Sequence, residues 1–358
     1  MKRQKTTVGI IFGGMSAEHE VSIESAKAIV KNIDKKKYTP HLIYINKKGK
    51  WCQLKEGDLL DAKSYDQSPF FQKKLKSLYQ FYSFAPWKNN SIKPLDCDIF
   101  FPMLHGPNGE DGKIQSLLEL SNIPHIGANS FSSTLAMNKV MTKILFKQSG
   151  LNTPDFLSFT ENNFSFIEAL ILDRLQLPVF VKPCSLGSSV GISKVKKRIQ
   201  LRPAIDLAFE NDHQIIIEQA IDAREIEISV MGNNQIKVSH PGELIPHNEF
   251  YDYADKYIEN KTTFNIPARL DKKTESEVKE MAKKAYLALY LNGMARIDFF
   301  LEKKSNQLYI NEINTIPGFT EISMFPKLWS LEGISFTDLI TRLIEYGFEY
   351  YKEHNRLW

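Results

Sequence analysis

The segment that decides the fold is ARIDFFLEKKSNQLYINEINTIPG, residues 295–318. Two runs of β-type sequence flank the polar turn KKSN, which predicts an antiparallel hairpin with a short loop. If the turn is centred on Ser305, Asp298 faces Glu312 on the same side of the sheet, because side chains alternate with a period of two. The hairpin therefore predicts two carboxylates held against each other.

Like charges directly opposite each other are destabilising, so this pair favours a cation between them. In the same register Arg296 faces Asn314, whose amide oxygen completes an oxygen-rich set suited to Mg²⁺. Arg296 would then hold an anion beside the metal. The alternative is a solvated hairpin face with alternating charges, and a register shift of one residue would put the two carboxylates on opposite faces.

The composition is that of a multidomain globular protein. The chain has 358 residues, of which 42% are hydrophobic and 25% are charged. No apolar run approaches the roughly 18 residues of a membrane span. Three cysteines without CxxC spacing do not indicate a disulfide framework, and a net charge of +4 with scattered lysines does not favour nucleic acid. We expect a cytoplasmic protein with neither a membrane nor a nucleic-acid partner.

Upstream of the hairpin, short β-rich runs alternate with helical patterns over residues 8–127. This alternation predicts an α/β fold with a parallel, doubly wound sheet. Residues 46–94 are lysine-rich, polar and aromatic, and we interpret them as a surface insertion. Residues 133–150 are predicted to form one helix that ends at a glycine cap, with a domain boundary near Ser130. The strands and helices of the later part indicate α+β domains.

The loop KPCSLGSSVG, residues 182–191, follows the apolar run LPVFV. Its order differs from that of a Walker A loop. Lys182, the backbone N–H groups, Ser188 and Ser189 could still enclose a triphosphate, although an ordinary turn between strands is the alternative. Cys184 is interpreted as a small filler, because no partnered histidine is evident.

Two loops follow predicted strands in the first domain, at the sheet edge where ligands bind in α/β folds. GGMSAEHEVS, residues 13–22, places Glu18 near a helix start, where it could bind an ammonium group or simply complement the helix dipole. MLHGPNGEDG, residues 103–112, contains His105. That histidine is either a ligand-binding group or a loop residue without a role.

Two later segments carry further candidates. In IIIEQAIDAREIEI, Glu218 and Glu225 could bind a base and a ribose, or could be exposed acids at strand ends. HNEFYDYADKY, residues 247–257, is polar and aromatic and ends in Lys256 and Tyr257. We interpret it as a loop that closes over a site.

In chain order, the motifs FGGMSAEHEVS, HGPNGEDG, MNK, VKPCSLGSSVGISKV, FYDYADKY, RIDFF and NEINTIPGFTEIS closely resemble those of the D-alanine–D-alanine ligases, which belong to the ATP-grasp superfamily. The resemblance covers about residues 8–346. It implies an N-terminal α/β domain (1–130), a central ATP-grasp domain (131–228) and a C-terminal ATP-grasp domain (229–358). It also implies two steps, in which a D-alanyl acyl phosphate forms from ATP and is attacked by the amine of a second D-alanine.

The resemblance assigns residues to an ATP site, a metal site and a substrate site. The residues that it assigns to ATP are Lys139, Lys182, Glu218, Ile221, Glu225 and Lys256. Those assigned to a pair of Mg²⁺ ions, with Mn²⁺ as an alternative, are Asp298, Glu312 and Asn314. Those assigned to the D-alanine substrates are Glu18, His105, Lys256, Arg296, Gly318 and Ser323.

The resemblance also implies a catalytic group, whose members are Glu18, Ser188, Tyr257, Arg296 and Gly318. Glu18, Ser188 and Tyr257 match a hydrogen-bonded trio that ties the closing loop to the active site. Arg296 and the backbone N–H of Gly318 would stabilise oxygen charge in the tetrahedral intermediate.

This sequence departs from the family pattern at three positions, and alternative functions stay open. Asn138 stands where many members have Asp, Leu186 where a polar residue is frequent, and Ala220 where an aromatic is common. A variant that takes D-lactate or D-serine second is one alternative, although the retained DKY favours an amine nucleophile. An inactive nucleotide-binding regulator is another, marked by loss of the hairpin residues, which are all present. The resemblance further implies a homodimer that supplies peptidoglycan precursors.

Overall fold

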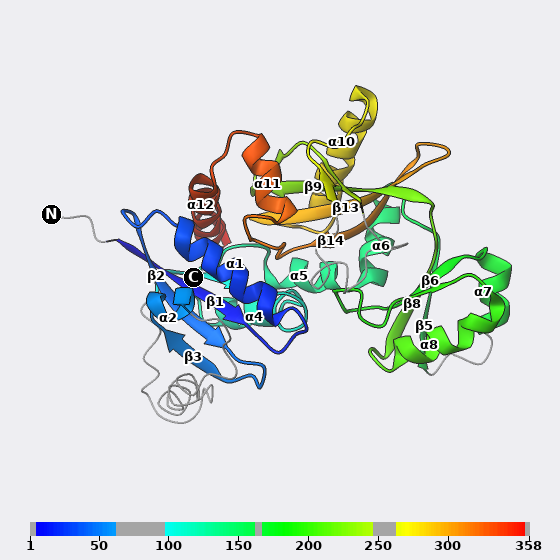
Figure 1. Cartoon of the computed structure of the whole chain (residues 1–358), viewed down its shortest axis with the longest axis horizontal. Helices are drawn as coiled ribbons and strands as arrows, with labels where there is room; N and C mark the ends of the chain where they lie inside the picture. The colour runs from blue at the N-terminus through cyan, green and yellow to red at the C-terminus, as the bar shows by residue number, and fades with distance from the viewer. Residues whose placement is uncertain (1–4, 62–96, 162–166, 246–262, 355–358) are drawn as a thin grey trace.

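The computed structural model describes residues 5–61, 97–161, 167–245 and 263–354. These residues form three β-sheets, each covered by helices (Figure 1). The sheet of the N-terminal residues and the sheet of residues 156–219 lie at opposite ends of the molecule, and the sheet that contains the predicted hairpin lies between them. The mixture of helices and sheets confirms the predicted α/β and α+β class.

The N-terminal sheet has the strand order β3-β2-β1-β4. Its strands are β1 (Thr6–Gly13), β2 (Tyr38–Ile45), β3 (Trp51–Leu54) and β4 (Ile99–Met103). β2 and β4 run parallel to β1, as predicted, whereas β3 is an antiparallel edge strand. β3 and the short helix α2 (Glu56–Asp61) come from the stretch 46–94 that was predicted to be a surface insertion, so its first part belongs to the sheet. Residues 62–96 lie outside the described residues.

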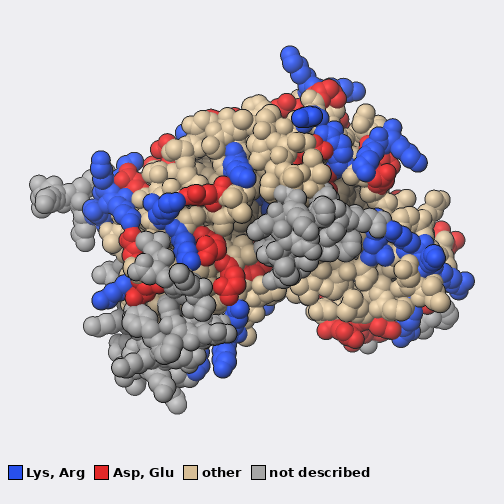
Figure 2. Space-filling model, viewed as in Figure 1, with Lys and Arg blue, Asp and Glu red and all other residues tan. Residues whose placement is uncertain are grey.

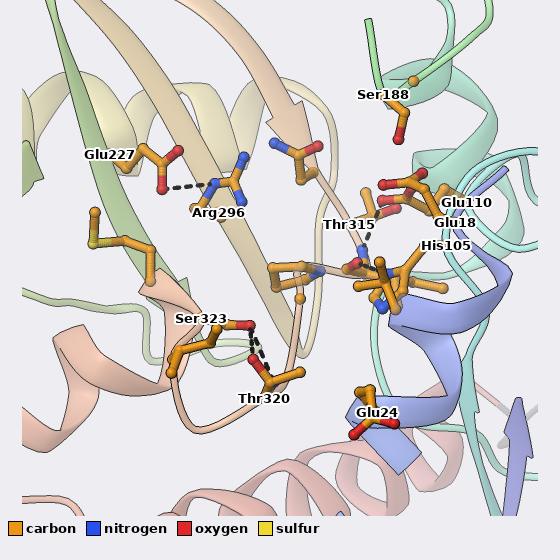
Figure 3. A pocket seen from close by; sticks show the side chains of 18 of the residues that line it. Glu18, Glu24, His105, Glu110, Ser188, Glu227, Arg296, Thr315, Thr320 and Ser323 are labelled. Atoms are coloured by element: carbon orange, nitrogen blue, oxygen red, sulfur yellow. Dashed lines mark hydrogen bonds and ion pairs between the residues drawn. The ribbon is translucent and has the colours of Figure 1, made fainter. Parts of the chain in front are cut away.

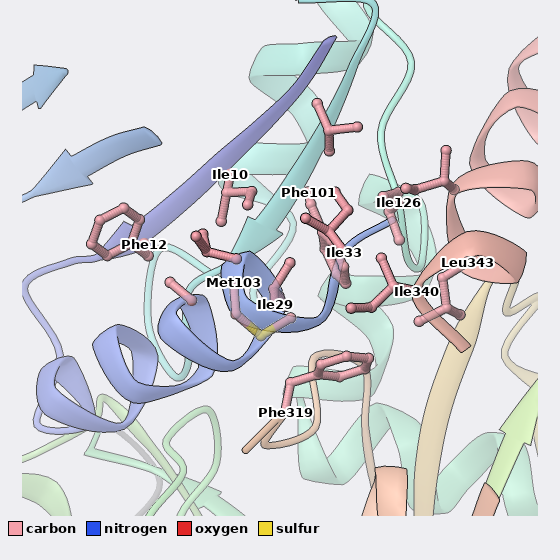
Figure 4. Close-up of a cluster of buried hydrophobic side chains, with 14 of the residues drawn as sticks. Ile10, Phe12, Ile29, Ile33, Phe101, Met103, Ile126, Phe319, Ile340 and Leu343 are labelled. Atoms are coloured by element: carbon pink, nitrogen blue, oxygen red, sulfur yellow. The ribbon is translucent and has the colours of Figure 1, made fainter. Parts of the chain in front are cut away.

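Helices cover both faces of this sheet. On one face, side chains of α1 (His19–Asn32) and the C-terminal helix α12 (Phe336–His354) pack against alternate residues of β1, such as Ile10 (Figure 4). On the other face, Ile11 packs with α4 (Lys113–Leu120). The alternation of buried side chains along β1 therefore produces the predicted doubly wound arrangement. Because α12 lies more than 300 residues after β1 in the sequence, distant parts of the chain share one core.

The middle sheet has the order β12-β11-β9-β13-β14, with β10 paired to β9. Its strands are β9 (Ala223–Met231), β10 (Lys237–Val238), β11 (Gly242–Ile245), β12 (Thr263–Asn265), β13 (Met294–Glu302) and β14 (Leu308–Asn314). Helix α10 (Lys272–Ala288) packs on this sheet. Residue 228, the predicted end of the central domain, lies inside β9, so this strand continues through the predicted boundary.

The predicted hairpin is formed by β13 and β14. Arg296 pairs with Asn314 and Asp298 pairs with Glu312, which confirms the predicted facing. The predicted turn centre does not hold along the whole hairpin, because the register shifts between Asp298 and Phe299 and leaves Asn311 unpaired. This β-bulge inserts one residue into β14.

The third sheet has the order β5-β8-β6-β7. Its strands are β5 (Phe156–Thr160), β6 (Val179–Pro183), β7 (Ser193–Val195) and β8 (Gln214–Gln219). It is covered by α8 (Leu201–Phe209), the short helix η2 (Arg198–Gln200) and α7 (Ile167–Arg174), and its apolar residues form a separate core. The loop 182–191 connects two adjacent antiparallel strands of this sheet.

The single helix predicted over residues 133–150 is wrong, because two helices occur there. α5 (Ser130–Met137) ends and α6 (Lys139–Gln148) begins at Asn138, whose backbone is extended. The side chain of Asn138 accepts a hydrogen bond of 2.9 Å from the N–H of Met141 and so caps α6. A helical hydrophobic period continues across such a break, so periodicity alone cannot detect it.

After the hairpin, the chain continues into helix α11 (Met324–Leu331).

On the face shown in Figure 2, Lys and Arg side chains lie among Asp and Glu side chains. None of the helices that the structure describes has the length and apolar character needed to cross a bilayer.

Candidate active site

A cavity of about 990 Å³ lies where three parts of the chain meet. These are the N-terminal loops 13–22 and 103–112, the loop 182–191, here called the Gly/Ser loop, and the hairpin of β13 and β14 with the segment that follows it. Segments far apart in the sequence line it. Predicted site residues among its walls are Glu18, His105, Lys139, Ser188, Arg296, Glu312, Asn314, Gly318 and Ser323. In Figure 3, Arg296 lies across the cavity from Glu18 and His105. The fold thus brings most of the predicted substrate and catalytic residues to one place.

Glu18 lies at the start of α1, directly after β1 and its glycine turn. Its carboxylate approaches the Gly/Ser loop, because a Cβ added to Gly187 would lie 3.6 Å from Glu18 Oε2. The backbone N–H of Glu18 donates to Ser16 Oγ at 3.2 Å, and Ser16 Oγ donates to the carbonyl of His105 at 2.7 Å. The two predicted N-terminal loops are therefore joined.

His105 is buried and makes its hydrogen bonds to two other segments. Its Nδ1 lies 2.9 Å from the carbonyl oxygen of Ile316, and its Nε2 lies 3.2 Å from Ser25 Oγ. Burial lowers the pKa of the His105 imidazole, which favours the neutral form.

Glu110, in the same loop as His105, was not predicted as a site residue. It lines the cavity and accepts hydrogen bonds from the N–H of Gly106 at 2.8 Å and of Ile316 at 3.3 Å. Burial, together with the negative charge of Glu18, raises the pKa of the Glu110 carboxyl to about 8. The sequence feature that could have indicated Glu110 as a site residue is its place within the motif HGPNGEDG, beside His105.

The Gly/Ser loop has a strained backbone at two serines. Ser188 and Ser189 have φ of 54° and 58°, in the left-handed region that non-glycine residues rarely occupy. Ser188 Oγ is buried and has no hydrogen-bond partner within the described part of the chain. The Nζ of Lys139 donates to the carbonyl of Leu186 at 2.5 Å, which ties α6 to this loop. Lys256 and Tyr257, predicted to close over the site, lie outside the described residues.

Lys182 does not line the cavity but takes part in a buried charge cluster. Its Nζ lies 2.7 Å from Glu218 Oε2, and Lys143 Nζ lies 3.2 Å from Glu218 Oε1. Burial alone would raise the pKa of Glu218, but the two ammonium groups lower it to about 2. Lys143 was not predicted. Its spacing of three residues from the buried Val140 and Phe146 places Lys143 on the apolar face of α6, and this spacing could have indicated a buried lysine.

Ile221 and Glu225 lie near the start of β9, outside the cavity. Ile221 is half-buried in the connection between β8 and β9, and Glu225 pairs with Phe300 and Leu244 of neighbouring strands. The negative charge of Glu225 reaches Lys182 and contributes to its raised pKa, although burial opposes this and Glu218 contributes more.

Arg296 binds two acids on the face of the middle sheet. It donates two hydrogen bonds of 2.7 Å to Asp298, and its Nε lies 3.3 Å from Glu227 Oε2 (Figure 3). Asn314 Nδ2 donates to Asp298 Oδ2 at 3.0 Å. Burial disfavours the guanidinium charge, but Asp298 and Glu227 raise the pKa of Arg296 well above its ordinary value. The group stays charged and positioned.

The predicted metal residues have the donor set of a hard cation. Asp298 and Glu312 face each other with Asn314 beside them, supplying carboxylate and amide oxygens. Across the described ranges, no group of three or more His, Cys, Asp or Glu side chains could hold a metal ion. The predicted set contains only two such residues. The set fits Mg²⁺ in ligand type, and both oxygens of Asp298 accept hydrogen bonds from Arg296.

Gly318 and Ser323 lie in the segment between β14 and α11. Ser323 is the residue before α11, and its Oγ accepts a hydrogen bond of 3.0 Å from the N–H of Thr320. A Cβ added to Gly318 would lie 3.0 Å from Ser323 Oγ, closer than side chains normally approach. Gly318 thus allows the backbone to pass close to this hydroxyl at the cavity wall.

Comparison with known proteins agrees with this architecture. The family model described as D-ala D-ala ligase N-terminus matches residues 7–128, and the one described as D-ala D-ala ligase C-terminus matches residues 145–345. A protein named D-alanine–D-alanine ligase from Thermoanaerobacter sp. (strain X514) is 45% identical, with 99% of this chain and 100% of the relative covered. D-alanine–D-alanine ligase A of Salmonella typhimurium is 42% identical, with coverage of 99% and 98%.

Solved structures are similar over the whole length. The structure of the D-alanine–D-alanine ligase from Coxiella burnetii has a TM-score of 0.85 and 34% identity, covering 99% of this chain and 97% of that chain. The VanG D-Ala:D-Ser ligase from Enterococcus faecalis has a TM-score of 0.83 and 32% identity, covering 96% and 100%.

The fold and the cavity, considered with these structural neighbours, define an ATP-grasp enzyme of the carboxylate–amine ligase class. Within that class, the chain belongs to the D-alanine–D-alanine ligase family. The resemblance stated from the sequence motifs is confirmed.

Proposed function

We propose that this chain joins two D-alanine molecules at the expense of ATP and supplies the dipeptide for peptidoglycan synthesis. The observation that carries the proposal is the convergence of Glu18, Ser188, Arg296 and Gly318 on one cavity. A carboxylate, a hydroxyl, a guanidinium and a backbone N–H are the groups that recognition of an amino acid and transfer of its acyl group require.

The first D-alanine binds at the end of the cavity formed by the N-terminal loops. The Glu18 carboxylate holds its ammonium group, and His105 lies beside it. Glu18 is suited to this because it stands after a strand of a parallel sheet, where ligand sites occur. The carboxylate of this D-alanine is then directed toward the γ-phosphate of ATP.

ATP lies between the third sheet and the middle sheet. Lys139 and Lys182 contact its phosphates, Glu218 and Ile221 lie at the adenine edge, and Glu225 contacts the ribose. Because Glu218 is paired with Lys143 and Lys182, its carboxylate mainly holds the lysines in place. The base contact at this edge is therefore assigned chiefly to the backbone.

The reaction proceeds in two displacements. An oxygen of the first D-alanine carboxylate attacks the γ-phosphorus, the bond to the β-phosphate oxygen breaks, and ADP leaves. The amine of the second D-alanine then attacks the acyl carbon, loses a proton, and expels inorganic phosphate. Arg296 and the N–H of Gly318 stabilise the oxygen charge of the tetrahedral intermediate.

Asp298, Glu312 and Asn314 would hold Mg²⁺, with Mn²⁺ as an alternative. When bound, a pair of these ions neutralises charge on the transferring phosphoryl group. The facing carboxylates of Asp298 and Glu312 support this assignment, because two opposed negative charges repel each other and a bound cation relieves the repulsion.

Ser323 and Lys256 bind the carboxylate of the second substrate or the phosphate. Tyr257 on the closing loop completes a trio with Ser188 and Glu18. The buried Oγ of Ser188 supports this, because it has no partner among the described residues and needs one. We also propose a homodimer located in the cytoplasm, on the basis of the family alone.

The deciding experiment measures ATP-dependent phosphate release by the purified chain in Mg²⁺, with D-alanine, L-alanine, D-serine or D-lactate. We expect release with D-alanine that stops when L-alanine replaces it, and dipeptide in the product. Preference for D-serine or D-lactate as second substrate would establish the variant activity. Absence of release above background with every substrate would leave the inactive nucleotide-binding protein as the remaining function.

A further inference from the structure

The segment 315–320 crosses the cavity wall without helix or strand structure, and it contains Gly318. Several of the contacts that set its position are made with the N-terminal domain. The side chain of Phe319 is fully buried in the N-terminal core, where its ring lies 5.7 Å from that of Phe101 in an edge-on arrangement (Figure 4). The rings of Phe336 and Phe325 lie 5.2 Å and 5.9 Å from that of Phe319, so first-domain residues and later residues of the chain hold this segment together.

A ring of buried hydrogen bonds holds the same segment through its backbone. The N–H of Phe319 donates to Ser25 Oγ at 3.2 Å. Ser25 Oγ lies 3.2 Å from His105 Nε2, and His105 Nδ1 lies 2.9 Å from the carbonyl oxygen of Ile316. The ring begins and ends on residues that flank Gly318, and Ser25 is the ring member that comes from α1.

The partners determine where the protons lie. A carbonyl oxygen only accepts, so His105 Nδ1 must carry a proton. With Nε2 unprotonated, the Ser25 hydroxyl donates to it and keeps a lone pair for the N–H of Phe319. Every donor in the ring then has one acceptor. An Nε2–H tautomer would leave the Ile316 carbonyl facing an unprotonated nitrogen.

The charges around His105 come from three segments. Glu18 and Arg296 act on it with opposite signs, and Glu110 from its own loop accepts from the N–H of Ile316. Burial lowers the pKa of His105 by more than the negative charge of Glu18 raises it. The neutral ring required by the hydrogen-bond pattern is thus also the form that the surroundings favour.

We propose that Ser25 is a positioning residue for catalysis: through neutral His105, protonated on Nδ1, it holds residues 316–319 so that the Gly318 N–H meets the developing oxygen charge. This rests on the proposed function, which assigns that N–H to the tetrahedral intermediate. A displacement of about 1 Å in such a donor costs about 100-fold in rate.

The first test compares Ser25→Ala with Ser22→Ala. Ser22 is equally buried in the same helix. Its hydroxyl accepts from the N–H of Gly13 and donates to the carbonyl of Met103, and neither bond reaches residues 316–319. We expect Ser25→Ala to lower kcat for D-alanine-dependent phosphate release about 10- to 100-fold, with less than about twofold change in KM for ATP. Ser22→Ala should lose similar thermal stability yet keep kcat within about threefold. Equal kcat values in the two variants would overturn the proposal.

The second test does not depend on activity. Ring ¹⁵N NMR of the full chain, with the His105 signal assigned by its loss in His105→Gln, reports the tautomer directly. The Nδ1–H neutral form at pH 7.5 is expected, and Ser25→Ala should shift the Nε2 resonance. An Nε2–H tautomer or an imidazolium would refute the ring even if the enzyme is active. Conversely, absence of D-alanine-dependent turnover in the unmodified chain would refute the proposed function while leaving the NMR result intact.

Discussion

Asp298 lies directly opposite Glu312, and the register of their two strands shifts by one residue immediately after Asp298. If the pairing of Leu301 with Leu308 continued unchanged, Asp298 would face Asn311 and Glu312 would point to the other side of the sheet. The unpaired Asn311 therefore turns the Glu312 carboxylate into the cavity. Bulges commonly re-aim side chains in this way beside active sites.

Replacement of Asp298 by Asn should abolish most turnover. The substitution keeps the size and one acceptor oxygen but removes the negative charge that balances Arg296 and would bind Mg²⁺. We expect kcat at saturating Mg²⁺ to fall by about 100-fold or more. Glu302→Gln, at the end of the same strand, serves as the control and should retain activity. Near-normal turnover of Asp298→Asn would contradict the metal assignment.

Glu218 should be essential for stability rather than only for nucleotide binding. Glu218→Gln leaves the ammonium groups of Lys143 and Lys182 buried beside a neutral amide. Removing one partner of a buried ion pair typically costs about 3–5 kcal/mol, which urea unfolding would detect. Lys143→Met should cost less, because the contact between Lys182 and Glu218 remains. Asp222→Asn, which removes an exposed pair with Lys303, is the control and should leave the unfolding midpoint unchanged. A larger loss in Lys143→Met than in Glu218→Gln would argue against this account.

The raised pKa of Glu110 predicts a loss of stability as the pH rises. The folded protein holds this proton up to a pH of about 8, whereas the unfolded chain releases it near the ordinary value of 4.5. Between these values the folded state binds more protons, so stability decreases with increasing pH. Glu110→Gln should remove this decrease, and therefore gain stability relative to the unmodified chain between pH 5 and 8.

Thermal unfolding at several pH values checks this prediction. Glu119→Gln is a control of opposite sign: burial raises the pKa of Glu119, but hydrogen bonds from His125 and Ser130 outweigh this and lower it. Glu119→Gln should therefore lower stability above pH 4.5, and this loss should shrink as the pH falls below 4.5. Parallel stability curves for Glu110→Gln and the unmodified chain between pH 5 and 8 would show that Glu110 is ionised throughout.

Ser188→Ala should separate stability from activity. The Ser188 hydroxyl has no partner in the described structure, so its removal should leave the thermal midpoint unchanged or slightly raised. If the hydroxyl bonds to the closing loop during catalysis, kcat/KM for D-alanine should fall about 10- to 100-fold. Ser193→Ala, at the start of β7, provides a control outside the cavity. Unchanged kcat/KM in Ser188→Ala would remove Ser188 from the catalytic group.

Much of the fold could be predicted from the sequence because it is recorded in short-range periodicities. The β-type runs of β13 and β14 predicted the hairpin, and alternating strand and helix patterns predicted the parallel sheet around β1. The turn centre assumed at Ser305 gave the facing of Asp298 and Glu312, but in the structure this facing arises from the bulge at Asn311. The break at Asn138 was missed, since a cap that replaces one helical residue leaves the hydrophobic period intact. The order of the motifs was sufficient to identify the family.

The local sequence by itself determined which residues form strands and helices and which loops carry polar groups at strand ends. Only the tertiary structure decided which of those groups meet. Lys143 reaches Glu218, and Ser25 reaches Phe319 through a contact 294 residues apart in the chain. Such contacts depend on how whole sheets and helices pack, and a burial that shifts the pKa of Glu110 or His105 arises from atoms of several segments at once. No pattern within one segment carries that information.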